Sequence, residues 1–195
     1  MLLIRHRINT IQDLKTVAPE MGVELDLREA GGEVILQHDP FKSGESFEEY
    51  LKHYRHGLMI LNIKSEGIEE RVSELVKKNG VKSYFFLDTA FPAMMKLIRE
   101  GEKHIAARFS EHEPIEGCLA LKGRVEWVWV DCFTRLPFTP QSYALLKPHF
   151  KLCLVSPELQ QHPKEMIADF KKELKVYPVD AVCTKYPELW QSSKN

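Results

Sequence analysis

The feature that most constrains the fold is a regular alternation of short apolar runs with amphipathic segments along the whole chain. Eight runs are brief and rich in β-branched, aromatic or aliphatic residues, which is typical of strands. These predicted strands are Leu2–His6, Val23–Leu27, Leu58–Lys64, Ser83–Leu87, His104–Arg108, Glu126–Asp131, Lys151–Val155 and Asp180–Thr184. Strands that alternate with helices favour a parallel sheet covered by helices, the α/β class.

The intervals between these runs carry apolar residues at three- and four-residue spacing, which predicts helices. The predicted helices are Thr10–Ala18, Phe47–Arg55, Ile68–Lys78, Pro92–Arg99, Gln141–Leu146 and Lys164–Leu174, with a weaker one at 113–121. Gly31-Gly32 predicts a turn after the second strand, so that Glu33–Gln37 forms a hairpin leading to His38.

Two architectures accommodate eight such units: a closed barrel and an open doubly wound sheet. An open sheet usually carries a glycine-rich first turn, and Arg7-Ile8-Asn9 contains no glycine. The sequence therefore predicts a single (β/α)8 TIM barrel over residues 1–195. It would be compact, with short loops, because about 200 residues is near the lower limit for this fold.

Composition limits the classes of partner. The formal net charge is -1, and no long run of one sign indicates a nucleic-acid groove or a membrane-surface patch. No apolar stretch approaches the roughly 20 residues that span a bilayer, and Met1–Ile4 is too short for a secretion signal. We expect a cytoplasmic protein. The widely spaced cysteines are expected to be buried free thiols: Cys118, Cys132, Cys153 and Cys183.

Two acids share one face of the second predicted strand. Side chains alternate along a strand, so Glu24 and Asp26 point one way while the apolar residues beside them point the other. Two inward carboxylates repel each other and lose hydration, which a divalent cation with oxygen ligands would relieve. The alternative is a pair of buried acids satisfied by arginine and backbone donors.

Polar residues also end neighbouring strands. Asn62 and Lys64 share one face of the third strand, and barrel enzymes place their chemistry at such carboxyl ends. The alternative for Lys64 is a lysine that reaches solvent. His6 and His38 each close a strand-like run, and imidazole suits proton transfer near neutral pH.

Other polar residues at strand ends are weaker candidates for the mouth of a barrel. They are Asp88, Arg108 and Asp131, with Trp129 on the same face as Asp131. The alternative is the ordinary polarity of a barrel rim.

Several of these residues together resemble a known family. The runs His6-Arg7, Asn9-Thr10, Glu24-Leu25-Asp26 and His38-Asp39 are similar to the opening signature of the glycerophosphodiester phosphodiesterases, which are phospholipase-C-like TIM barrels. Leu61–Lys64 stands where that family has a Glu-x-Lys strand, and Asp180–Pro187 resembles its carboxyl-terminal motif. The chain thus looks like a short, divergent member.

The resemblance implies a hydrolase of small glycerophosphodiester-like substrates, with a role in lipid metabolism. It implies that His6 and His38 are the general acid and base, without assigning which is which. A divalent ion, Mg²⁺ or Ca²⁺, would be held by Glu24, Asp26 and Asn62. Carried over in the same way, the cations Arg7 and Lys64 would bind the substrate phosphate, which a guanidinium can grip with two hydrogen bonds.

The chain also departs from the family pattern. Ile8 stands where the family has glycine, and Asn62 replaces a metal-ligand glutamate. The amide oxygen can bind a hard cation but supplies no charge, so we expect weaker metal binding or a site completed by substrate phosphate. Two alternatives remain open: a catalytically silent barrel that binds a phosphorylated ligand or a partner, and an enzyme in which Lys64 forms a Schiff base with a carbonyl.

Overall fold

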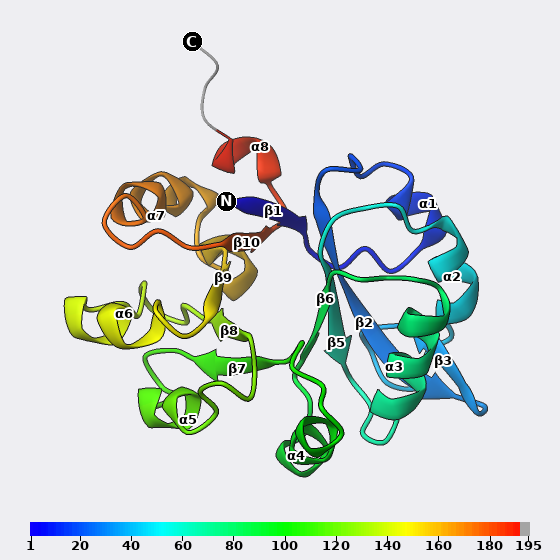
Figure 1. Cartoon of the computed structure of the whole chain (residues 1–195). Helices are drawn as coiled ribbons and strands as arrows, with labels where there is room; N and C mark the ends of the chain where they lie inside the picture. Colours follow the sequence, from blue (N-terminus) through cyan, green and yellow to red (C-terminus); the bar gives the residue numbers. More distant parts are fainter. Residues whose placement is uncertain (192–195) are drawn as a thin grey trace. The chain divides into compact units, whose positions relative to one another are not determined.

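The computed structural model describes residues 1–191. The chain forms two compact units. Unit 2 comprises residues 6–105, drawn from blue to green in Figure 1, and unit 1 comprises residues 1–5 together with the described residues from 106 onward. Every residue of the predicted metal and phosphate site lies in unit 2.

Unit 2 is built on a mixed sheet. Its strands are β2 (Gly22–Ala30), β3 (Glu33–Leu36), β4 (Glu45–Ser46), β5 (Met59–Ile63) and β6 (Tyr84–Leu87). In this sheet β5 lies between β6 and β2 and is parallel to both. On the other side of β2, β3 pairs antiparallel with β2, and β4 pairs antiparallel with β3. The predicted hairpin is confirmed: Gly31 and Gly32 turn the chain with φ of 61° and 86°, values that glycine adopts without strain.

The helices of unit 2 are α1 (Ile11–Leu14), α2 (Phe47–His53), α3 (Glu69–Lys78) and α4 (Phe91–Arg99). Three of them match the predicted ranges closely, but α1 ends four residues earlier than predicted. Thr16 N and Val17 N bond to carbonyls three residues back, so the chain tightens into turns after Leu14. Pro19 follows at once and disfavours helical geometry in the residue before it.

Unit 1 is built on five parallel strands in the order β7-β8-β9-β10-β1. They are β1 (Leu2–Arg5), β7 (Ala106–Phe109), β8 (Trp127–Val130), β9 (Lys151–Val155) and β10 (Ala181–Thr184). The first strand of the chain therefore pairs with its last. The helices are α5 (Ile115–Leu119), α6 (Pro140–Leu146), η1 (Pro157–Gln160), η2 (Lys164–Met166), α7 (Ile167–Glu173) and α8 (Pro187–Trp190).

The α/β class and all eight predicted strands are confirmed. Three short elements were not predicted: β4, η1 and α8. The predicted helix at Lys164–Leu174 begins as a 3₁₀ turn, η2, and becomes α-helical only from Ile167. All four cysteines are buried free thiols, as expected. Within residues 1–191, no helix has both the length and the apolar character needed to cross a membrane.

Candidate functional site

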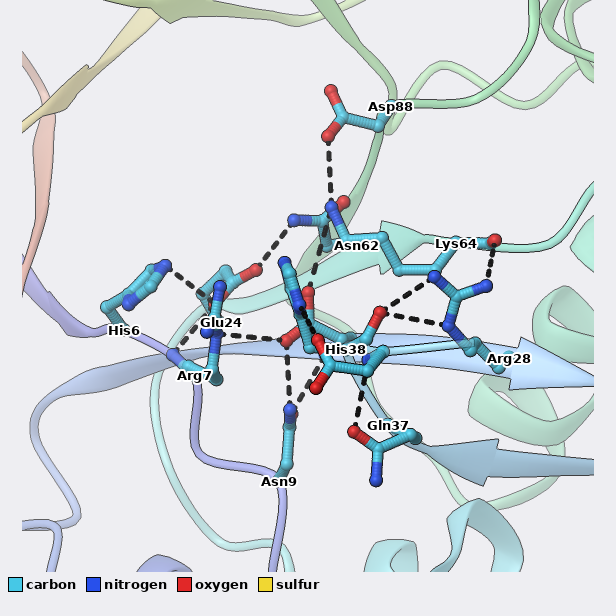
Figure 2. Close-up of polar contacts among 12 residues, drawn as sticks. His6, Arg7, Asn9, Glu24, Arg28, Gln37, His38, Asn62, Lys64 and Asp88 are labelled. Atoms are coloured by element: carbon cyan, nitrogen blue, oxygen red, sulfur yellow. Dashed lines mark hydrogen bonds and ion pairs between the residues drawn. The ribbon is translucent and has the colours of Figure 1, made fainter. Parts of the chain in front are cut away.

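The candidate site lies where the middle of β2 runs beside the carboxyl end of β5. These strands are parallel neighbours, and their register places Asp26 opposite Asn62. Figure 2 shows the side chains of Glu24 and Asn62 meeting between the two strands. Glu24 and Asp26 are only 1% exposed and Asn62 is 8% exposed. Strand alternation therefore buries two carboxylates and an amide together.

The loop after β1 wraps around these carboxylates. The backbone N–H of Arg7 donates to Glu24 Oε2 over 2.8 Å. Asn9 Nδ2 donates to Asp26 Oδ2, and Asp26 N donates back to Asn9 Oδ1, each over 2.9 Å. Arg7 has a φ of 55°, a left-handed conformation that costs a non-glycine residue about 1–3 kcal/mol. Two hydrogen bonds at Ile8 stabilise this turn. Ile8 N donates to Glu24 O, and Ile8 O accepts from the buried Tyr50 hydroxyl.

Cationic side chains surround the carboxylates. Arg7 Nε lies 3.5 Å from Asp26 Oδ2, and Lys64 Nζ lies 3.7 Å from Asp26 Oδ1. Lys64 Nζ also lies 3.4 Å from Asp88 Oδ2, so this rim candidate joins the cluster. His6 Nε2 lies 3.7 Å from Glu24 Oε2. Six of the seven residues predicted for the site are thus linked by direct polar contacts: His6, Arg7, Glu24, Asp26, Asn62 and Lys64.

The electrostatics of the carboxylate pair are unfavourable without a further cation. Burial, followed by repulsion from Asp26, raises the pKa of Glu24 to about 7. Hydrogen bonds from Asn62 Nδ2 and Arg7 N and the charge of Lys64 oppose this rise without cancelling it. One proton or one cation is therefore needed to relieve the pair near neutral pH.

The donor atoms fit a hard divalent cation. Asn62 Nδ2 donates to Glu24 Oε1 over 2.8 Å, while Asn62 Oδ1 is buried and accepts no hydrogen bond from the described residues 1–191. This oxygen, which lacks a hydrogen-bond donor, and the two carboxylates together form an all-oxygen ligand set of the kind that Mg²⁺ or Ca²⁺ prefers. In residues 1–191, no three His, Cys, Asp or Glu side chains are grouped in a way that could hold a metal. The donor set here is two carboxylates and one amide oxygen.

His38 is placed differently from the other predicted residues. Within residues 1–191, no hydrogen bond or ion pair joins its ring to Glu24 or Asp26. His38 Nδ1 instead contacts Asp39 Oδ1 over 2.8 Å. Hydrogen bonds from His38 and then Lys42 lower the pKa of the half-exposed Asp39 to about 2. An ionised carboxylate can only accept hydrogen bonds, so Nδ1 is the donor in this contact and carries the proton. The other ring nitrogen, Nε2, is then unprotonated in the neutral ring.

Sequence reasoning missed two positioning residues. Arg28 Nε and Nη2 donate to His38 O over 2.9 and 2.7 Å, and Nη1 donates to Lys64 O over 2.7 Å. Figure 2 shows this guanidinium between the two backbone carbonyls. Its position two residues after Asp26, on the same strand, was an available signal. Asn9 was noted within a motif but was given no role.

The remaining rim candidates belong to a polar network of unit 1. Arg108 Nη2 donates to Asp131 Oδ2 over 2.6 Å, and Arg108 Nε donates to Glu113 Oε1 over 2.7 Å. Burial raises the pKa of Asp131 despite the charge of Arg108, and Trp129 is buried. Their part in a binding site stays a prediction.

No family model and no curated protein matches the sequence. Solved structures do match. A glycerophosphodiester phosphodiesterase from Agrobacterium tumefaciens superposes with a TM-score of 0.69 at 15% identity, covering 97% of this chain and 98% of that one. A glycerophosphoryl diester phosphodiesterase from Parabacteroides distasonis gives 0.66 at 13% identity, covering 100% and 89%. The chain therefore shares the fold of the glycerophosphodiester phosphodiesterases, and the resemblance indicated by its motifs is confirmed at the level of the fold.

Proposed function

We propose that this chain is a metal-dependent phosphodiesterase that cleaves a small glycerophosphodiester-like substrate. The observation that carries the proposal is the buried pair Glu24 and Asp26 beside the orphaned oxygen of Asn62. The names of the two matching structures support the same reaction class. The proposal includes a closed (β/α)8 barrel forming one domain over residues 1–195, as the sequence predicts.

In this proposal Glu24, Asp26 and Asn62 hold Mg²⁺ or Ca²⁺. When bound, the ion would polarise a phosphoryl oxygen and offset the charge that builds up in the transition state. The carboxylates must be deprotonated to bind it, so the raised pKa of Glu24 makes binding compete with a proton near pH 7. Asn62 contributes an oxygen without charge, which weakens affinity relative to a third carboxylate.

Arg7 and Lys64 bind the substrate phosphate. The Arg7 side chain is 45% exposed, so its guanidinium can reach a ligand while its main chain anchors Glu24. A guanidinium can grip two phosphate oxygens at once, and an ammonium adds a point charge. The ion pairs of Lys64 with Asp26 and Asp88 fit this role better than a Schiff-base role.

His6 and His38 transfer the protons. One histidine accepts the proton of an attacking water or a neighbouring substrate hydroxyl as its oxygen bonds to phosphorus. The other donates a proton to the departing alcohol oxygen as its bond to phosphorus breaks. Asp39 fixes the His38 tautomer, leaving Nε2 to exchange the proton.

The test is hydrolysis of glycerophosphodiesters and of a chromogenic phosphodiester by the purified full chain. We expect activity with Mg²⁺, Ca²⁺ or Mn²⁺, none with EDTA, and losses of at least about 100-fold in His6→Ala and His38→Ala. His53→Ala is the matched control, because His53 is exposed at the end of α2 and outside the site. Activity that persists in EDTA and in both site variants would refute the proposal.

One observation favours a second candidate function, a catalytically silent barrel that binds a phosphorylated ligand. Asn62 is neutral where a third carboxylate would hold the ion, and its amide already donates to Glu24. This alternative predicts saturable binding of a phosphodiester, weakened by Lys64→Gln, without turnover under any metal condition.

A further inference from the structure

A polar pocket of unit 2 lies at the opposite ends of β5 and β6 from the candidate site. Its volume is about 540 Å³. One wall is 54–57, which connects α2 to β5, and the other is 79–83, which connects α3 to β6. Both segments precede the amino ends of these strands, whereas Asn62, Lys64 and Asp88 stand at or beyond the carboxyl ends. These elements are labelled in Figure 1.

The pocket carries positive charge without a counter-charge. Its lining contains Arg55 and Lys82 but no Asp or Glu. Both cations are exposed, and within residues 1–191 neither forms an ion pair. Nearby lysines behave differently, because Lys78 Nζ pairs with Glu48 over 2.7 Å and Lys77 Nζ lies 3.7 Å from Glu102. Two unpaired cations in one concave lining attract an anion more strongly than isolated surface charges do.

The wall that carries Arg55 is held in place by its own hydrogen bonds. Arg55 Nη1 donates to Tyr54 O over 2.6 Å, and the buried Tyr54 hydroxyl donates to Gly57 O over 2.7 Å. Gly57 N donates to Met21 O over 2.8 Å, and His56 Nε2 contacts Val17 O over 3.0 Å. A wall ordered before binding loses little entropy when a ligand arrives.

We propose that this pocket binds a phosphate monoester carried by a small soluble molecule. Two cations match the double charge of a phosphate monoester better than the single charge of a carboxylate or a diester. The guanidinium of Arg55 suits two phosphate oxygens, and Lys82 adds a point charge. The lining also contains the Ser83 hydroxyl as a further donor, and the volume leaves room for a small organic group beside the phosphate.

The test is an NMR titration of the isotopically labelled full chain with inorganic phosphate and with methyl phosphate at constant ionic strength. We expect saturating shifts of the backbone amides at 55–57 and 80–83. Residue assignment separates them from any binding at Arg7 and Lys64. The double variant Arg55→Gln with Lys82→Gln should weaken affinity at these amides by about tenfold or more, because two charge-assisted contacts are lost.

The matched control is Lys122→Gln with Arg124→Gln, which removes the same charges from exposed positions outside the pocket and should leave the affinity unchanged. Three results would overturn the proposal: no saturable shift at 55–57 and 80–83, an affinity unaffected by the Arg55 and Lys82 changes, or equal shifts with chloride. Binding seen only with phosphatidic-acid vesicles would also contradict it, because the phosphate would then be lipid-borne.

Discussion

Two buried glutamates of unit 2 are stabilised to very different extents. Glu102 Oε1 accepts hydrogen bonds from Lys103 N, His104 N and the His104 ring, and Oε2 accepts from the Tyr84 hydroxyl. Burial alone would raise the pKa of Glu102, but these hydrogen bonds outweigh it and the pKa is lowered. Glu24 is also buried, yet its pKa is raised to about 7.

The difference lies in the surroundings rather than in the burial. Glu24 accepts hydrogen bonds from Arg7 N and Asn62 Nδ2, but a second buried carboxylate, Asp26, stands beside it. The hydrogen bonds of Glu102 offset the effect of its burial, whereas the contacts of Glu24 do not offset its burial and the repulsion from Asp26. Burial therefore does not single out a candidate functional carboxylate; a pKa raised by incomplete compensation of its charge does.

The largest expected effect is on catalysis. Glu24→Gln should reduce phosphodiesterase activity by at least the roughly 100-fold that damage to a metal site's outer shell can cause. Glu102→Gln should leave activity near that of the wild type when assayed well below its unfolding temperature. Steady-state assays of both variants check this, and equal losses in the two would erase the contrast between the sites.

Stability should depend on pH through Glu24. Its pKa in the folded protein is raised above the ordinary 4.5, so its contribution to stability is present below pH 4.5 and is lost as pH rises through about 7. In EDTA, the free energy of unfolding of the wild type relative to Glu24→Gln should fall by up to roughly 3 kcal/mol across this range. Urea unfolding at several pH values measures it, and a difference independent of pH would contradict the shift.

The two glutamates should also differ in how much their substitution changes the free energy of unfolding. Glu102→Gln places an amide donor against N–H and O–H donors, so the free energy of unfolding at pH 8 should fall by about 1–3 kcal/mol. In metal-free buffer at the same pH, Glu24→Gln should be neutral or stabilising, because it removes a repulsion. Denaturant unfolding of both variants in parallel tests these two predictions. A larger loss of unfolding free energy in Glu24→Gln than in Glu102→Gln would contradict our interpretation.

A smaller change should sharpen the metal hypothesis. Asn62→Asp adds a third carboxylate to the site, so the affinity for Mg²⁺ should rise by about tenfold, which corresponds to about 1.4 kcal/mol. In EDTA the same variant should be less stable than the wild type. Calorimetric titration and thermal unfolding measure the two effects, and a variant that binds metal no better would indicate that Asn62 is not a ligand.

Much of the fold could be predicted because its signals are local. The strands are short apolar runs with polar ends, and Gly31-Gly32 marks a turn that only glycine makes easily. The shared face of Glu24 and Asp26 followed from alternation along one strand, and their burial is observed. The early end of α1 was missed because the helical spacing of apolar residues continues past Leu14, whereas the α-helical hydrogen bonding of the backbone ends there.

What could not be predicted depends on contacts distant in the sequence. Alternation along the strand places Arg28 on the face of Glu24 and Asp26, but no local pattern shows that its guanidinium binds the carbonyls of His38 and Lys64. The same holds for Glu102, whose burial and saturation depend on Tyr84, 18 residues earlier. The pairing of Asn62 with Glu24 likewise needed the register of β5 against β2.

The central claim is that Glu24 and Asp26 form an incompletely compensated pair that binds a divalent cation. Its most direct test is calorimetric titration of the metal-free full chain with Mg²⁺ and with Mn²⁺ at pH 8. We predict one saturable ion per chain, lost in Glu24→Gln and in Asp26→Asn and retained in Glu102→Gln. Binding that is absent from the wild type, or unchanged in Glu24→Gln and Asp26→Asn, would contradict the claim.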